Sequence, residues 1–199
     1  MKSSLQKLTC LTLALALFLT ASGAMAASLN SATITMSSSD WEENFMMMVT
    51  FTEENYDFKM ADSSAFSVAE FPALNGTVGF EHSLGIAGFM KVSYYDYGDD
   101  VFNSAILTIS LDHEDALVEM AMLTIFYTIL AGDLDTTEEE YEALVEAMCP
   151  IFNEVFSGQE HVNGSQAATL RGVGYAMEVN DDERFIRLYT NVSLTQNED

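Results

Sequence analysis

The feature that most constrains the fold is an apolar segment at residues 116–131, whose polar members are Glu119 and two threonines. Acidic residues precede it at 112–115 and follow it at 133–140. A membrane-spanning helix needs about 20 apolar residues, and its cytoplasmic end usually carries Lys or Arg. The segment is too short and too acidic at its flanks, so it predicts a helix inside a folded domain. Because apolar side chains lie nearly all round this helix, over residues 112–132, we expect both of its sides to be buried.

The N-terminus has the organisation of a secretory signal peptide. A positively charged start precedes an apolar run at 8–19, and Ala24 and Ala26 give the small-x-small pattern of a cleavage site. We expect residues 1–26 to be removed and residues 27–199 to form one secreted domain, extracellular or periplasmic. No further membrane span is expected after this cleavage.

The charge of the chain excludes several classes of partner. It carries 31 acidic residues against 7 lysines and arginines, for a formal net charge of -24. A nucleic-acid binder that neutralises phosphates, or a protein that docks on anionic lipids, needs the opposite balance. After signal cleavage Cys149 is the one cysteine left, so no internal disulfide can form and the core must hold the fold.

Residues 39–52 have the pattern of an N-terminal helix. Ser39 and Glu42 fit a capping box. Four large apolar side chains follow at helical spacing: Trp41, Phe45, Met48 and Val49. The stretch 48–52 also has the composition of a strand. The acidic residues near the start favour the helix, because the N-terminus of a helix attracts negative charge.

Short apolar or alternating runs, broken by Gly, Asn and Asp, predict strands on both sides of the helical region. The first group lies at 56–60, 66–68, 76–82, 85–95 and 103–111, with a turn at 96–100. The last two lie at 169–179 and 185–192 and are joined as a hairpin by 180–183.

A second central helix is predicted at 136–158, with Thr136 and Glu139 as its capping box and Pro150 as a kink. The order of elements indicates an α+β fold. We expect an antiparallel meander sheet with the N-terminal helix and the central helix pair packed on one face, closed by a C-terminal β-hairpin.

One side of the first central helix has the composition of a ligand pocket. It carries apolar surface with a few polar groups, contributed by Met120, Thr124, Tyr127 and Thr128. The same side fits equally well a second core layer in which the hydroxyls bond back to the carbonyls of the helix.

The C-terminal hairpin has the composition of a partner-binding surface. Arginine and aromatic side chains are typical of interface centres. The hairpin offers Arg171, Tyr175, Phe185, Arg187 and Tyr189. Small residues at 172, 174 and 176 either allow close approach of a helix or leave a shallow concave sheet face for a partner.

The histidines give the weakest catalytic signal. His113 stands among acidic residues, an arrangement in which a carboxylate can orient an imidazole as a general base. No nucleophile motif accompanies it, and no two of the three histidines have metal-ligand spacing. The acidic stretch from Asp133 begins like an EF-hand loop, but Glu138 and Leu144 stand where that loop needs Gly and Glu.

The sequence therefore assigns no catalytic residue, no metal site and no cofactor. It predicts a secreted, non-enzymatic binding module for a protein partner or a small ligand. The alternatives are an extracellular hydrolase with a site assembled around His113 or His161, and a carrier of a small apolar ligand.

Overall fold

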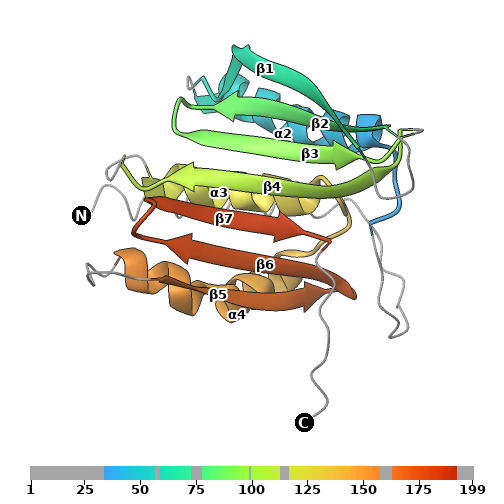
Figure 1. Cartoon of the computed structure of the whole chain (residues 1–199). Coiled ribbons are helices and arrows are strands. Elements are labelled where there is room, and N and C mark those ends of the chain that lie inside the picture. The colour runs from blue at the N-terminus through green and yellow to red at the C-terminus, as the bar shows by residue number, and fades with distance from the viewer. Residues whose placement is uncertain are drawn as a thin grey trace.

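The computed structural model of the chain describes residues 34–56, 59–72, 78–98, 100–112, 117–156 and 163–191. Within these ranges the fold is a seven-stranded antiparallel sheet with three helices (Figure 1). The mixed α+β class with an antiparallel sheet is therefore confirmed. The expected signal peptide at 1–26 lies outside the described residues.

The first half of the fold is a helix followed by a meander of four strands. Helix α2 (Ser38–Tyr56) leads into β1 (Ala61–Pro72), β2 (Val78–Ile86), β3 (Met90–Asp96) and β4 (Phe102–Ser110). Each of these strands pairs antiparallel with the next.

The second half consists of two helices followed by three strands. Its elements are α3 (Leu117–Leu130), α4 (Glu138–Phe156), β5 (Asn163–Leu170), β6 (Val173–Asn180) and β7 (Phe185–Thr190). The last strand, β7, pairs with β4, so the strand order is β1-β2-β3-β4-β7-β6-β5. The C-terminal hairpin of β6 and β7 thus lies inside the sheet, and β1 and β5 form its edges.

The core lies between the sheet and the helices, which stand behind the sheet in Figure 1. Its largest fully buried side chains are Trp41, Phe45, Met60, Ile86, Leu107, Ile109, Ile125, Ile129, Met148, Tyr175 and Ile186. Helix α4 packs closely on β5, whereas α2 packs on α3, β3 and β4. Among the described helices, none is both long enough and apolar enough to cross a membrane.

The N-terminal segment is a helix, so the alternative strand at 48–52 is wrong. The four apolar side chains at helical spacing are all buried against the core. The cap differs from the prediction, because the hydroxyl of Ser37 accepts the bond from the N–H of Asp40 at 2.9 Å. Ser39 lies within the helix.

Two strand predictions in the first half are wrong. Residues 56–60 contain the end of α2 and an irregular stretch at 59–60. The predicted break at residues 83 and 84 lies inside β2, and the chain reverses instead at Ala87–Phe89. Ala87 and Gly88 have φ of 52° and 80° there, a left-handed conformation that a glycine signals more clearly than an alanine.

The predicted strand at 169–179 is in fact two strands. Arg171 and Gly172 have φ of 49° and 82°, as a two-residue hairpin turn requires, and they join β5 to β6. The usual sequence signal for this turn is Asn-Gly, which Arg-Gly does not match. Strand β5 itself was not predicted beyond its last residues, because its side chains are mostly polar or small.

The second central helix, α4, begins at Glu138, and its capping box lies one residue later than predicted. Thr137 and Glu140 form the capping box, in which the Thr137 hydroxyl accepts a bond from the N–H of Glu140 at 3.3 Å. The Glu140 carboxylate accepts the reciprocal bond from the N–H of Thr137 at 2.9 Å. The first central helix is described from Leu117, and Pro150 lies within α4.

Candidate functional site

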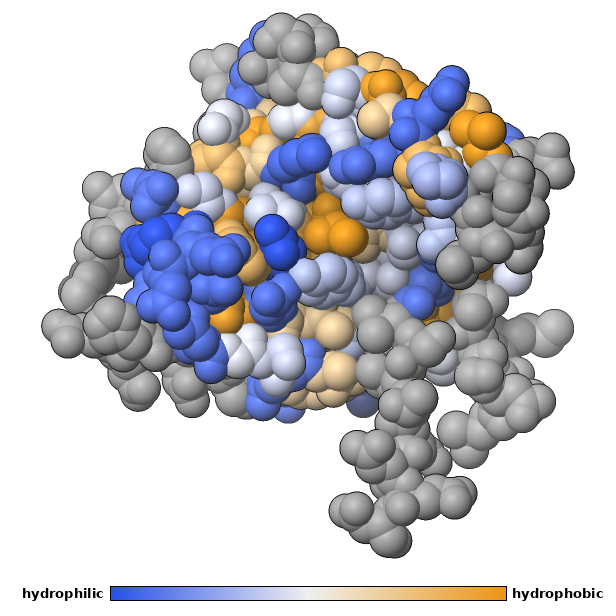
Figure 2. Space-filling model, viewed as in Figure 1, coloured by the Kyte–Doolittle hydropathy of each residue, from blue (hydrophilic) through white to orange (hydrophobic). Residues whose placement is uncertain are grey.

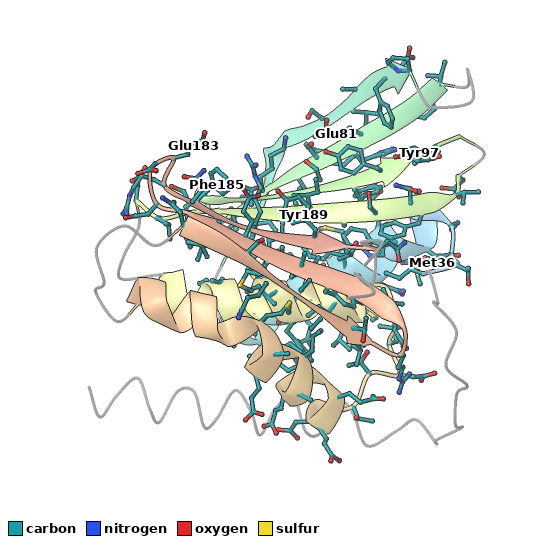
Figure 3. All side chains as sticks on the ribbon, turned by 60° about the horizontal axis from the view of Figure 1, so that its bottom comes forward. Met36, Glu81, Tyr97, Glu183, Phe185 and Tyr189 are labelled. Carbon is teal, nitrogen blue, oxygen red and sulfur yellow. The ribbon has the colours of Figure 1, made fainter. Side chains whose placement is uncertain are left out.

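The sheet face turned away from the helices carries three of the five residues predicted for partner binding. Side chains alternate along β7, so Ile186 and Leu188 enter the core while Phe185, Arg187 and Tyr189 lie on the opposite face. On that face Arg187 and Tyr189 are half-buried, whereas Phe185 is only 7% exposed. Figure 3 shows Phe185 and Tyr189 on that face, away from α3 and α4. We call the three residues the β7 row.

The β7 row is held together by contacts with Glu178 on β6. The guanidinium carbon of Arg187 lies 3.9 Å from the centre of the Phe185 ring, a cation–π contact. Its Nη1 lies 4.0 Å from the Glu178 carboxylate. The Tyr189 hydroxyl donates a 2.5 Å hydrogen bond to the same carboxylate. Burial and this bond raise the pKa of Tyr189.

A shallow hollow of about 400 Å³ adjoins the β7 row. It is lined by Asn163, Gly164, Ser165, Ala176, Met177, Glu178, Val179, Asn180 and Tyr189. Small side chains on β5 and β6 leave this space open beside the larger side chain of Tyr189. The same sheet face is seen in Figure 2, where polar side chains gather at the left, the side of the β6–β7 turn, and apolar ones lie among them.

The other two predicted partner residues lie elsewhere. Tyr175 is 1% exposed, because side chains alternate between the two faces of β6 and Tyr175 lies on the core face. Arg171 lies in the β5–β6 turn, where it bonds Asp133 at 3.0 Å and Glu140 at 2.9 Å. Glu178, which joins Arg187 to Tyr189, was not singled out from the sequence. Glu178 lies directly opposite Arg187 on the neighbouring strand, but this position follows only from the β6–β7 pairing, which the sequence alone does not give.

The predicted ligand residues on α3 are packed in the core. Thr124 and Thr128 are fully buried, and their hydroxyls donate to the carbonyls of Met120 and Thr124 at 2.8 and 2.7 Å. The Tyr127 hydroxyl is hydrogen-bonded to Thr52, and Met120 packs against the core. None of the four side chains lines the hollow beside the β7 row. This arrangement matches the second core layer that the sequence also allowed.

A cavity of about 350 Å³ lies between α2 and the first three strands. We call it the α2 cavity. Its lining consists of Trp41, Glu42, Phe45, Met46, Ala61, Phe66, Leu84, Val92 and Tyr94. Helix α2 contacts β3 and β4 more closely than β1, which leaves this space on the core side of β1. Val68, on that face of β1, is accordingly 51% exposed.

Glu42 is the charged residue of the cavity lining, and it accepts a hydrogen bond from the Tyr94 hydroxyl. Burial, the bond to Glu42 and the charges of Glu42, Asp100 and Asp96 together raise the pKa of Tyr94 above its ordinary value of 10. His82 stacks on the Tyr94 ring with 4.6 Å between ring centres. The buried indole N–H of Trp41 has no acceptor among the described residues, and a water molecule could satisfy it.

The residues of the hydrolase hypothesis cannot be placed in this geometry. His113 and His161 both lie outside the described residues, as does the side chain of Cys149. In the described part of the chain, no three His, Cys, Asp or Glu side chains come together as metal ligands. Comparisons with protein-family models, with curated proteins and with solved structures found no match for this chain.

Proposed function

We propose that the protein is a secreted binding module whose surface for a protein partner is the β7 row and the adjoining hollow. The proposal places residues 27–199 in one domain after removal of residues 1–26. The observation that carries it is the grouping of Phe185, Arg187 and Tyr189 beside a hollow, on a sheet face that no described helix covers.

The β7 row has two properties of a binding centre. Aromatic residues and arginine supply most of the binding energy in many interfaces. Here Arg187 is already held by Phe185 and Glu178, so less side-chain entropy is lost when a partner binds.

The charge around the row favours a basic partner. Glu178 lies in the hollow, and the neighbouring β6–β7 turn carries Asp181, Asp182 and Glu183. The chain as a whole has a net charge of -24. A partner with a positively charged surface is attracted to this field, and the attraction weakens as salt is added.

The experiment is a pull-down from the secreting culture with the tagged protein, followed by native mass spectrometry of what is recovered. The test variant is Arg187→Ala with Tyr189→Ala. The matched control is Lys91→Ala with Tyr95→Ala. It also removes one cation and one tyrosine from this face of the sheet, but from β3 instead of β7. We expect a stoichiometric protein companion that the test variant loses and the control keeps. A companion retained by both variants would contradict the proposal.

A further inference from the structure

The α2 cavity supports a second binding site, independent of the proposed protein surface. We propose that the cavity binds a small organic ammonium ion with an apolar body, such as an alkyl- or arylammonium. Its residues come from α2 and β1–β3, whereas the β7 row lies on the opposite face of the sheet and on different strands.

The lining of the cavity matches the two parts of such a ligand. Aromatic rings attract cations through their electron-rich faces and bury apolar groups equally well. The cavity has four aromatic residues: Trp41, Phe45, Phe66 and Tyr94. Trp41 stacks on Phe45 and Phe102, and Tyr94 stacks on His82. The 44% exposed Phe66 is therefore the ring most open to a cation, and the other rings supply apolar surface. Aliphatic side chains of Leu84, Val92 and Met46 complete an apolar wall.

The electrostatics select the charge of the ligand. Glu42 brings one carboxylate to an otherwise uncharged lining, and among the described residues it forms no ion pair. The carboxylates of Asp96 and Asp100 add to the negative field at Tyr94. An anion would meet repulsion here, whereas a neutral molecule would gain nothing from the charge.

The size of the cavity limits the ligand to a small molecule. A volume of about 350 Å³ is at the lower end of the range of ligand pockets in proteins. Phe66 lines the space and is 44% exposed, so one side of the cavity opens to solvent and gives a ligand a way in.

The chain carries its own reporter for this site, because Trp41 is its one tryptophan and lines the cavity. The experiment titrates the whole protein with phenyltrimethylammonium and follows tryptophan fluorescence. A parallel titration uses tert-butylbenzene, which has nearly the same shape without the charge. We expect a saturable change with the cation and at least about tenfold weaker binding of the neutral molecule.

Two variants test the role of Glu42. Glu42→Gln keeps an acceptor for the Tyr94 hydroxyl but removes the charge, so it should weaken binding of the cation about tenfold and leave tert-butylbenzene unchanged. Glu43→Gln is the matched control, since Glu43 is the neighbouring, exposed residue of α2 and does not line the cavity. It should bind both molecules as the original protein does.

A third variant keeps the test decisive if Glu42→Gln fails to fold. Phe66 is partly exposed, so Phe66→Leu should fold while removing one aromatic face. It should weaken binding of the cation several-fold more than binding of tert-butylbenzene. Equal affinities for the two molecules, equal effects of the two glutamate variants, or no saturable response would each overturn the proposal.

Discussion

The guanidinium group of Arg171 forms two parallel hydrogen bonds with the carboxylate of Glu140, from Nε to Oε1 at 2.9 Å and from Nη2 to Oε2 at 3.0 Å. Arg171 lies in the β5–β6 turn and Glu140 in the first turn of α4, 31 residues earlier. The same guanidinium also bonds both carboxylate oxygens of Asp133 and the carbonyl of Asp135. One side chain therefore connects the edge hairpin to the start of the helix that packs on it.

The Arg171–Glu140 pair predicts a loss of stability in acid. The Arg171 guanidinium lowers the pKa of Glu140 to about 2, from an ordinary value of 4.5. Because the folded pKa is the lower one, ionised Glu140 stabilises the fold above the unfolded pKa, and this contribution is lost as the pH falls from 4.5 to about 2.

The test compares urea unfolding of Glu140→Gln with that of the original protein across this range of pH. We expect a loss of about 1 kcal/mol at pH ~7, modest because water screens the partly exposed pair, and almost none at pH ~2. Glu139→Gln removes a charge from the same turn without an Arg171 partner and should show no such pH dependence. A loss for Glu140→Gln that is equal at both pH values would refute the coupling.

Replacing Arg171 by lysine should also destabilise the fold. Lysine keeps the positive charge but cannot present parallel donors to Glu140 and Asp133 at once. We expect Arg171→Lys to lower the free energy of unfolding by about 1–2 kcal/mol. Arg187→Lys is the control, since Arg187 has no such fork and its loss should be within about 0.5 kcal/mol. Urea unfolding measures both variants. If Arg171→Lys lowers the free energy of unfolding as little as Arg187→Lys does, the positive charge of residue 171 is sufficient and the parallel hydrogen bonds add no stability.

Asp100 is predicted to stabilise the start of α2 from outside the helix. Its two carboxylate oxygens each lie 2.9 Å from the Ser39 hydroxyl, and Oδ1 also accepts the N–H of Ser39 at 3.0 Å. Its backbone is left-handed, with φ of 58°. Asp100→Ala removes these acceptors and places an alanine in a conformation that disfavours it, so we expect a loss of about 1–2 kcal/mol.

Asp100→Asn separates the two causes. Asparagine tolerates the left-handed conformation and keeps one acceptor, so its loss should be about half as large. Thermal unfolding followed by circular dichroism measures both variants. No loss for Asp100→Asn beside a full loss for Asp100→Ala would show that the left-handed backbone, and not the carboxylate of Asp100, accounts for the effect.

The buried tyrosines predict a loss of stability in alkali. Burial raises the pKa of Tyr94 and of Tyr175 above their ordinary value of 10, and the carboxylates of Glu42 and Asp133 respectively add to the shift. Because the folded pKa is the higher one, this contribution to stability is complete below the unfolded pKa and decreases as the pH rises above it.

An absorbance titration of the phenolate groups tests this prediction. We expect a fraction of the tyrosines to ionise only together with unfolding, and Tyr94→Phe to reduce that fraction. Phenylalanine keeps the ring of residue 94 but has no proton to lose, so its stability should decrease less steeply above pH ~10. Smooth ionisation of every tyrosine without unfolding would contradict the prediction.

Several elements could be predicted because their signal is local. The helical stripe of α2 repeats within a few residues, and its members are buried as expected. The alternation along β4 is also local, and Ala105, Leu107 and Ile109 are at most 1% exposed. The β6–β7 hairpin followed from an acidic turn between two apolar runs, which the structure has at 181–184.

The turns that the sequence did not predict depend on backbone angles that their residue types only weakly favour. Ala87 and Arg171 both adopt a left-handed φ, and neither residue type signals one. Arg171 is held in that conformation by acidic partners 31 to 38 residues away, which no local pattern contains. Strand β5 also lacks a local signal. Its pairing with β6 and its contact with α4 stabilise it as a strand more than its own side chains do.

The sequence by itself determined the composition of the candidate surfaces: an acidic chain, arginine and aromatic residues near the C-terminus, and an apolar stripe on the first helix. The tertiary structure decided which of these side chains meet. Pairing of β7 with β4 and β6 placed Arg187 beside Glu178, and strand alternation sent Tyr175 into the core. The closer packing of α2 on β3 and β4 than on β1 created the α2 cavity. The physical reason is that strand pairing and helix packing join residues far apart in the chain, so their register depends on the whole core and not on any local pattern.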